Sequence, residues 1–515
     1  MVFRVLALSF ILAFCSLFYE LIFAKTLTLA TSNFILAQTA ALGFYFLGIG
    51  VGSSKKIDPS KPLSFLHTEY VLSFLGCISP ALIYFIYFIF HLYMPSSTHI
   101  IILPTLLLIP FVVGIFTGKE FLHLLNFGEK HGVSASLVLA ATYFGNLVAG
   151  FAFPLFIYQS AGVVGSSYFA AALNLMVAIF LAIEVKKHTQ LFLAIPITLC
   201  FFFWGSNAAK VQNGILNLSY TKVYTPDFGT SHLKNIYVYV KSKMPSVRQH
   251  RTKYQDIDIV HKSNGHYSLF LNRKPQFSSD NYKGYHASLA EGFLNLHQNP
   301  LGNTLILGGG DGILAQYLIE RGAKRITLID LDPAITNLAR THPLFRRINK
   351  DSFNNKIVTV INGDAFSFLL KTSEKYDSIL IDFPLPTSLE LSKLYSREFY
   401  SLVKRSLKPN GGALFDSPIN FKFDYDKTKF KSKNQKIISA TLHAAGIKNH
   451  TGFGPHENFV YFNKKDEKRH FQYDLLPDSI SGRALVNLIE NSSFLEEAPI
   501  EKKYINSIFS PKRFQ

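Results

Sequence analysis

Cysteine is rare throughout the chain, and charge is rare in its first 207 positions. The chain of 515 residues has three cysteines, all within apolar stretches: Cys15, Cys77 and Cys200. The polar remainder therefore contains no disulfide, no thiolate nucleophile and no cysteine-ligated metal. Residues 1–207 hold only nine of the 52 Lys/Arg and six of the 34 Asp/Glu, a composition that is typical of a segment lying in lipid.

Apolar stretches of about 20 residues, the length that crosses a bilayer, fill this first region. We place seven of them, at 3–23, 33–52, 68–92, 99–118, 135–158, 164–184 and 190–206. A cleaved signal peptide is the alternative for the first stretch, but Glu20 interrupts its end and six further stretches follow. The sequence therefore predicts a multi-pass membrane domain over 1–207, with membrane lipid as a partner.

Loop charge raises a conflict over orientation. Lysines gather in the second, fourth and sixth loops: Lys55, Lys56, Lys61, Lys119, Lys130, Lys186 and Lys187. The positive-inside rule puts these loops in the cytoplasm, and seven spans then leave the C-terminal part outside. A miscount resolves the conflict if the last stretch, which contains Pro196, does not cross, or if 117–127 re-enters the membrane.

Acidic residues within the apolar stretches are costly at bilayer depth and are often functional. We expect Glu69, Glu120 and Glu184 to lie at the interface or to pair inside the helical bundle. Glu20 is deeper and suits a cation pathway, but no ordered relay of polar residues and no inverted repeat accompanies it.

Positive charge predominates after residue 207, where 43 Lys/Arg face 28 Asp/Glu. A basic domain binds nucleic acid or lies against an anionic lipid surface. No paired Cys/His site and no aromatic RNP stretch is present, so we expect no nucleic-acid partner. The excess charge fits a solvated surface that faces the membrane.

Two further domains follow the membrane region. Over 208–300, short apolar runs such as NIYVYV (235–240), DIDIV (256–260) and YSLFL (267–271) predict a small antiparallel β-domain. Over 301–515, five- to six-residue apolar strands alternate with helical stretches, which predicts an α/β doubly wound parallel sheet. Ligands of such sheets lie at the carboxyl ends of the strands.

Acidic residues end four successive predicted strands of this sheet: Asp311 after Gly308, Gly309 and Gly310, then Asp330, Asp364 and Asp382. An acid about 20 residues past a glycine loop suits a ribose diol. Four carboxylates around one crevice repel a pyrophosphate but attract a cation, so a nucleoside bearing a sulfonium fits. The alternative is that each acid caps a helix, which is strained for the whole set but remains open for Asp364.

The ordered motifs GGGDG, LIDLD, NGDAF and ILIDFPLP, with the upstream KYQDIDIV and LFLNRKPQFSSDNYKGYH, resemble the spermidine synthases, or polyamine aminopropyltransferases. FGPHENFVYF (453–462) resembles a later segment of the family. CSLFYELIFAKTL resembles its bacterial membrane-fused members. The resemblance implies a Rossmann-like fold of the class I S-adenosylmethionine type, an inner-membrane location and a cytoplasmic catalytic domain, despite the loop charge.

The resemblance also implies roles for individual residues. Gln255, the three glycines, Asp330, Asp364 and Ala365 would bind the nucleoside of decarboxylated S-adenosylmethionine, and Asp311 its primary amine. Asp382 would be the general base, and Tyr254, Tyr285 and His286 would line the site of the amine acceptor. The co-substrate is the only cofactor implied, with no permanently bound group and no metal.

Four positions depart from the family pattern. Leu385 and Ala287 stand where acids are usual, Asn272 where an acid is common, and Asp416 where glutamine is typical. These are positions that would hold the far ammonium of a diamine, so the acceptor stays open. Two other functions also stay open: a catalytically weak protein whose membrane half binds or passes polyamines, and another S-adenosylmethionine-dependent transferase. A homo-oligomeric state stays open as well.

Overall fold

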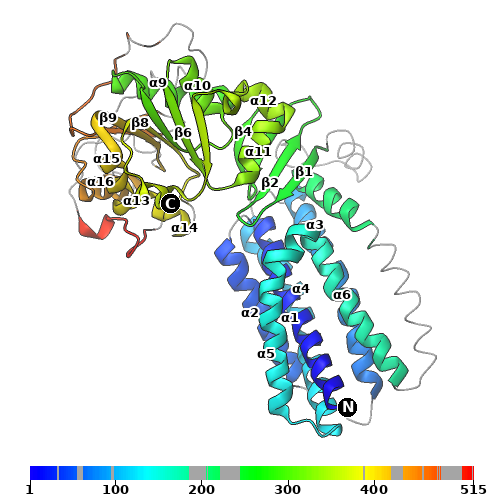
Figure 1. Cartoon of the computed structure of the whole chain (residues 1–515). Coiled ribbons are helices and arrows are strands. Elements are labelled where there is room, and N and C mark those ends of the chain that lie inside the picture. The colour runs from blue at the N-terminus through cyan, green and yellow to red at the C-terminus, as the bar shows by residue number, and fades with distance from the viewer. Residues whose placement is uncertain are drawn as a thin grey trace. The chain divides into compact units, whose positions relative to one another are not determined.

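The computed structural model divides into two compact units, Met1–Ser278 and Ser279–Gln515, each of which is described by itself (Figure 1). The residues that the structure describes are 1–31, 34–54, 62–93, 98–184, 205, 207–220, 244–386, 389–418, 433–454, 458–472, 474, 476, 501–512 and 514.

Long apolar helices make up most of the first unit: α1 Val2–Thr31, α2 Phe34–Ser53, α3 Pro62–Tyr93, α4 Thr98–Lys130, α5 Ala135–Ala152 and α6 Tyr158–Glu184. Five stretches of the described residues are long and apolar enough to cross a membrane. The first four overlap the first four predicted spans, and the fourth runs to Lys130, 12 residues past the predicted end at 118. The fifth, Ala135–Glu184, joins the next two through the π-helix Phe153–Ile157 and leaves helical geometry at Gly162, where φ is 69°.

The structure bears on one detail of the span prediction and leaves another untested. Residues 117–127 are part of the uninterrupted helix α4, so the alternative that they re-enter the membrane is wrong. The predicted span 190–206 lies outside the described residues except for position 205.

Glycines allow α2 and α4 to cross closely. A side chain on Gly48 or Gly52 of α2 would overlap the backbone of α4, and one on Gly114 or Gly118 of α4 would overlap the backbone of α2. Each helix thus presents a G-x-x-x-G pair to the other, the arrangement by which helices in lipid approach closely.

The small sheet of the first unit is antiparallel, in the order β1 Ser246–Arg251, β2 Asp256–His261, β3 Tyr267–Leu271 and β4 Lys274–Ser278. β2 and β3 confirm two predicted strands, whereas 235–240 lies outside the described residues. Asp256 joins the sheet to the helices: Lys25 Nζ lies 2.8 Å from Asp256 Oδ2, and the Tyr158 hydroxyl is 2.8 Å from both oxygens. Because Asp256 is only 1% exposed, these contacts supply its charge compensation.

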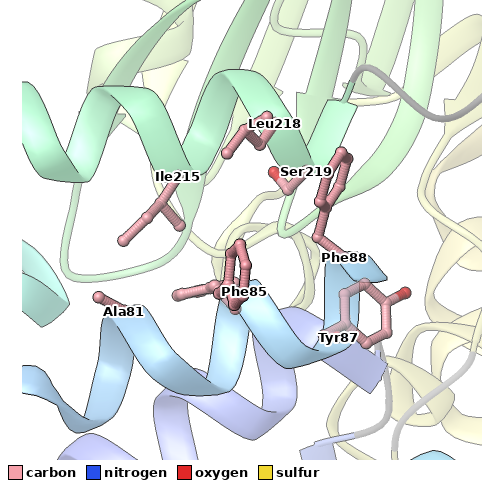
Figure 2. Close-up of a pocket in the computed structure, with 8 residues that line it drawn as sticks. Ala81, Phe85, Tyr87, Phe88, Ile215, Leu218 and Ser219 are labelled. Carbon is pink, nitrogen blue, oxygen red and sulfur yellow. The ribbon is translucent and has the colours of Figure 1, made fainter. Parts of the chain in front are cut away.

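An apolar cavity of about 220 Å³ lies between α3 and the helical segment 207–220 (Figure 2). It is lined by Ala81, Tyr84, Phe85, Tyr87, Phe88, Ile215, Leu218 and Ser219. The lining contains no carboxylate, histidine or lysine, and its polar groups are the hydroxyls of Tyr84, Tyr87 and Ser219.

The second unit is built on a seven-stranded sheet in the order β10-β11-β9-β8-β5-β6-β7. Its strands are β5 Asn303–Gly308, β6 Arg325–Asp330, β7 Val358–Asn362, β8 Tyr376–Asp382, β9 Leu407–Asp416, β10 Thr451–Phe453 and β11 Phe459–Asn463. β5 to β9 are parallel to one another, and β10 and β11 add an antiparallel edge.

Helices cover both faces of this sheet (Figure 1). They are α9 Tyr282–His297, α10 Ile313–Glu320, α11 Pro333–Thr341, α12 Pro343–Asn349, α13 Ala365–Lys371, α14 Leu389–Ser392, α15 Arg397–Ser406 and α16 Lys433–Ala444. Leu305 and Leu307 pack into the core under α13, α15 and α16, whereas Ile306 packs under α9 and α10. This alternation along β5 buries the strand on both faces and confirms the predicted Rossmann-like fold.

Candidate active site

The glycine loop after β5 is shaped by two close approaches. Gly308 has φ 86° and pairs with Asp382 of β8, and a side chain there would overlap the Asp382 carbonyl oxygen. A Cβ atom on Gly310 would lie 2.5 Å from Asp330 Oδ2. Glycine is therefore required at both positions by the neighbouring strand ends.

Asp330 ends β6 and faces this loop. Its Oδ2 accepts a hydrogen bond from the Gly310 N–H at 3.1 Å, and its Oδ1 accepts one from the Asp332 N–H at 2.9 Å. Asp332 caps helix α11, so the cap explanation fails for Asp330. Burial raises the pKa of Asp330 to about 6, although the two backbone donors oppose that shift.

Asp311 and Asp382 approach the same imidazole nitrogen. His286 Nε2 lies 3.8 Å from Asp311 Oδ2 and 3.9 Å from Asp382 Oδ2. Burial raises the pKa of Asp311, and the charge of Asp382 adds to the rise, while His286 and the Ile313 N–H oppose it. Both carboxylates retain some exposure, 13% for Asp311 and 14% for Asp382.

The tautomer of His286 follows from its other nitrogen. Nδ1 is 2.9 Å from the Tyr282 carbonyl oxygen, which can only accept, so Nδ1 carries the proton of that hydrogen bond. In the neutral ring, Nε2 is then an acceptor. An unprotonated Nε2 and the two carboxylates then converge, an arrangement that suits an N–H donor, whereas with a proton on Nε2 the imidazole is itself the cation that pairs with both acids.

Tyr285 links two strand ends. Its hydroxyl donates to Asp382 Oδ1 at 2.8 Å and lies 3.5 Å from Asp416 Oδ2 at the end of β9. Burial raises the pKa of Tyr285 well above its usual value, and the charges of Asp382 and Asp416 add to the rise. Tyr285 therefore stays a hydrogen-bond donor. Asp416 joins Asp311, Asp330 and Asp382 at the strand ends, and we call this set of carboxylates the acidic crevice.

Asp364 caps α13, whose first residue is the buried Ala365. Its side chain accepts from the Ser367 N–H at 2.8 Å, and Lys393 Nζ lies 3.0 Å from Asp364 Oδ2. Burial acts to raise the pKa of Asp364, but these two contacts outweigh it and lower the pKa. The cap role that stayed open for Asp364 is confirmed, whereas its lysine partner, 29 residues away, could not be predicted from the pattern.

The other positions that the sequence singled out belong to the first unit or follow β8. Tyr254 and Gln255 belong to the first unit, in the turn between β1 and β2, where Tyr254 is 40% exposed. Their contacts with a nucleoside or an acceptor stay predictions. Leu385 follows β8 and is 46% exposed.

The chemistry available to this crevice is that of binding a cation and moving a proton. Within the described residues, Lys393 on Asp364 and His286 are the basic groups that pair with its carboxylates. No group of three or more His, Cys, Asp or Glu in the described part suits a metal ion. The carboxylates at these strand ends outnumber those two basic groups, and this excess of negative charge favours a cationic ligand.

Comparisons with known proteins agree with this chemistry. Residues 282–436 match the spermine/spermidine synthase domain model. The chain is 29% identical over 464 residues to polyamine aminopropyltransferase 1 of Streptomyces coelicolor, covering 86% of this chain and 80% of that protein. It is 30% identical over 407 residues to the polyamine aminopropyltransferase of Leptospira interrogans, covering 77% and 75%.

Among solved structures, a spermidine synthase in complex with the transition-state analogue AdoDATO aligns over 43% of this chain and 73% of its own. The sequence identity is 20% and the TM-score is 0.36. The two relatives from Streptomyces coelicolor and Leptospira interrogans match over most of the chain, including parts of both units. The chain belongs to the polyamine aminopropyltransferase (spermidine synthase) family and is an enzyme of that class.

Proposed function

We propose that this enzyme is anchored in the membrane and transfers the aminopropyl group of decarboxylated S-adenosylmethionine to a putrescine-like amine. The products are a spermidine-like polyamine and methylthioadenosine. The convergence of His286 Nε2 with the Asp311 and Asp382 carboxylates carries the proposal. Two carboxylates that converge on one point suit the N–H groups of an amine, which both substrates bring.

The co-substrate is bound through its nucleoside and its ammonium. Asp330 accepts the ribose hydroxyls, and the glycine loop leaves room for the sugar beside it. Gln255, Asp364 and Ala365 contact the rest of the nucleoside. Asp311 binds the primary ammonium, a position where the carboxylate of ordinary S-adenosylmethionine would be repelled.

The reaction forms one C–N bond and breaks one C–S bond. The lone pair of the acceptor nitrogen attacks the carbon beside sulfur, and the C–S electron pair returns to sulfur as a neutral thioether. The acceptor must first lose a proton, because amines of this kind have a pKa near 10 in water. Asp382 takes that proton, while Tyr285 orients Asp382 through its 2.8 Å hydrogen bond.

Asp416 is proposed to replace the acids that are absent at Ala287 and Leu385. It lies 3.5 Å from Tyr285, which also contacts Asp382, so it extends the acidic crevice along β9. A carboxylate there pairs with the far ammonium of a diamine. The acceptor is therefore a diamine whose second nitrogen reaches the end of β9.

The apolar helices of the first unit are proposed to cross the bacterial inner membrane, with lipid as their partner and the second unit in the cytoplasm. The length and apolar composition of five stretches support the crossing of a membrane. The lysine-rich loops argue for the opposite orientation. Single cysteines placed at Ser54 and at Lys253 distinguish the two orientations, because a membrane-impermeant thiol reagent in intact cells does not reach the cytoplasmic side. Labelling at position 54 but not at 253 is expected if the catalytic part is cytoplasmic, and the reverse if the lysine-rich loops are.

The activity test uses the full chain in lipid nanodiscs with decarboxylated S-adenosylmethionine and a panel of monoamines, diamines and triamines. We expect methylthioadenosine release to require an amine and to be fastest with a diamine. Release of S-adenosylhomocysteine from ordinary S-adenosylmethionine would indicate a methyltransferase instead. Amine binding without turnover of any co-substrate would indicate a protein that binds polyamines.

A further inference from the structure

Four helices bring a polar cluster together inside the apolar bundle of the first unit. Glu69 of α3 is fully buried, and Glu120 of α4 is 4% exposed. Asn174 of α6 donates from Nδ2 to Glu69 Oε2 at 2.8 Å and to Glu120 Oε1 at 3.2 Å. Tyr19 of α1 donates to Asn174 Oδ1 at 3.0 Å. The amide nitrogen of Asn174 thus donates to both acids and bridges them.

The hydrogen-bond donors of this cluster are too few for two ionised acids. Asn174 uses both of its amide protons, one for each acid, and Tyr19 spends its proton on Asn174. Glu69 Oε1 is buried and accepts no hydrogen bond. The two carboxyl groups are neighbours because both accept from the same amide nitrogen, and a hydrogen bond between them requires that one of them carries a proton.

The charge of the cluster is likewise unbalanced. Within the described residues, no lysine, arginine or histidine forms an ion pair with Glu69 or Glu120. Two adjacent negative charges in an apolar core are strongly unfavourable, so the pair must hold a cation. A proton needs no cavity, whereas hard metal cations take six or more oxygen ligands. No group of three or more His, Cys, Asp or Glu is present for a metal in the described part.

We propose that Glu69 and Glu120 form a proton-binding site in the helical bundle, in which one proton is shared between the two carboxyl groups. The shared proton gives Glu69 Oε1 its missing donor and leaves one negative charge, which Asn174 stabilises through both acids. The site joins α3, α4 and α6, so gain or loss of its proton changes the packing of these helices. It is independent of the aminopropyl transfer proposed for the second unit.

Other titratable groups face the pair from the neighbouring helices. Cys15 and Tyr19 of α1 and Tyr45 of α2 interact with it electrostatically. The contact from α6 is the uncharged Asn174. Thiols and phenols are protonated at neutral pH, so below about pH 8 the acids themselves dominate the response.

The test is thermal unfolding of the full chain in nanodiscs between pH 6 and pH 8. A proton held in the folded protein and released on unfolding makes stability fall as the pH rises, so we expect the melting temperature to fall by about 3 °C or more. In Glu120→Gln the amide donates to Glu69 in place of the proton, so the fall should be mostly lost. Glu129→Gln, an exposed position on the same helix, is the matched control and should behave as the wild type.

Infrared difference spectra give a second readout that does not depend on melting. Wild type minus Glu120→Gln should show the loss of one protonated carboxyl absorption at pH 7, and Glu69→Gln should behave alike. An unchanged absorption would overturn the proposal. So would a melting temperature that depends on sodium or potassium, with choline as the control cation, because the pair would then bind a metal ion.

Discussion

Acidic residues cluster in both units of this enzyme, but their surroundings differ: those in the bundle are buried, and those at the strand ends are partly exposed. In the bundle, Glu69 and Glu120 are enclosed and share one amide donor from Asn174. At the strand ends, Asp311 and Asp382 keep 13% and 14% exposure around His286. The first arrangement suits a ligand as small as a proton, and the second leaves an approach for an organic cation. What a carboxylate binds therefore depends on how far it is enclosed and on which groups surround it.

The largest expected effect concerns the partly exposed carboxylates at the strand ends. Asp382→Asn removes the proposed proton acceptor and should lower turnover by roughly 10²–10⁴-fold, with little change in melting temperature. The measurement is methylthioadenosine release by the full chain. Asp351→Asn, which alters an exposed ion pair with Arg346, is the control. A loss smaller than tenfold for Asp382→Asn would assign the base to another group.

Asp416 tests how far the acidic crevice extends. Asp416→Asn should raise the KM for a diamine by about tenfold to a hundredfold, the usual effect of losing a hydrogen bond to a charged group. The KM for a monoamine of the same length should hardly change, because it has no second ammonium. An equal effect on both amines would mean that Asp416 acts only through Tyr285.

A substitution at Gly114 tests how tightly the helices of the bundle are packed. Gly114→Ala places a methyl group against the Tyr45 carbonyl, where α2 and α4 cross, and should cost about 1–3 kcal/mol of stability. Gly43→Ala on α2 meets no atom within 4 Å and serves as the matched control. Equal melting temperatures for the two variants would show that the close crossing of these helices is not maintained.

The smallest expected effect is the pH dependence of nucleoside binding at Asp330. Because the pKa of Asp330 is raised to about 6, the carboxylate is mostly protonated at pH 5 and mostly ionised at pH 7. Only the ionised form accepts both ribose hydroxyls, so methylthioadenosine affinity should rise about tenfold over that range. Methylthioadenosine has no ammonium, which keeps Asp311 out of the measurement. An affinity that is flat with pH, or unchanged in Asp330→Asn, would exclude this role.

Sequence reasoning reached the crevice because a rule connects distant positions there. Parallel strands end at one edge of a sheet, so Asp311, Asp330 and Asp382 could be grouped without knowing any contact. The rule does not extend to side-chain partners. Tyr285 and Asp416 are 131 residues apart, and nothing in the sequence pairs them. For Asp364, the pattern allowed both a cap and a ligand contact, and the structure confirms the cap.

The bundle was predictable in outline only. Apolar length located the helices, but hydropathy carries no information on which buried acids meet. Glu69 and Asn174 are 105 residues apart, and their contact depends on how α3 and α6 rotate about their axes. The kink at Gly162 likewise depends on a backbone angle that apolar composition does not specify. Pairing inside the bundle was one of two expectations for Glu69 and Glu120, and the close packing of the helices favours it.

Selection between the two forms of S-adenosylmethionine tests the central claim most directly. The measurement is calorimetric titration of the full chain in nanodiscs with the decarboxylated and the ordinary form, in wild type and in Asp311→Asn. We predict that wild type prefers the decarboxylated form by at least about tenfold, since like charges a few ångströms apart cost more than 1.4 kcal/mol at an effective dielectric constant near 20, and that the variant loses this preference. Equal binding of both forms, or a preference for the ordinary one, would contradict the account.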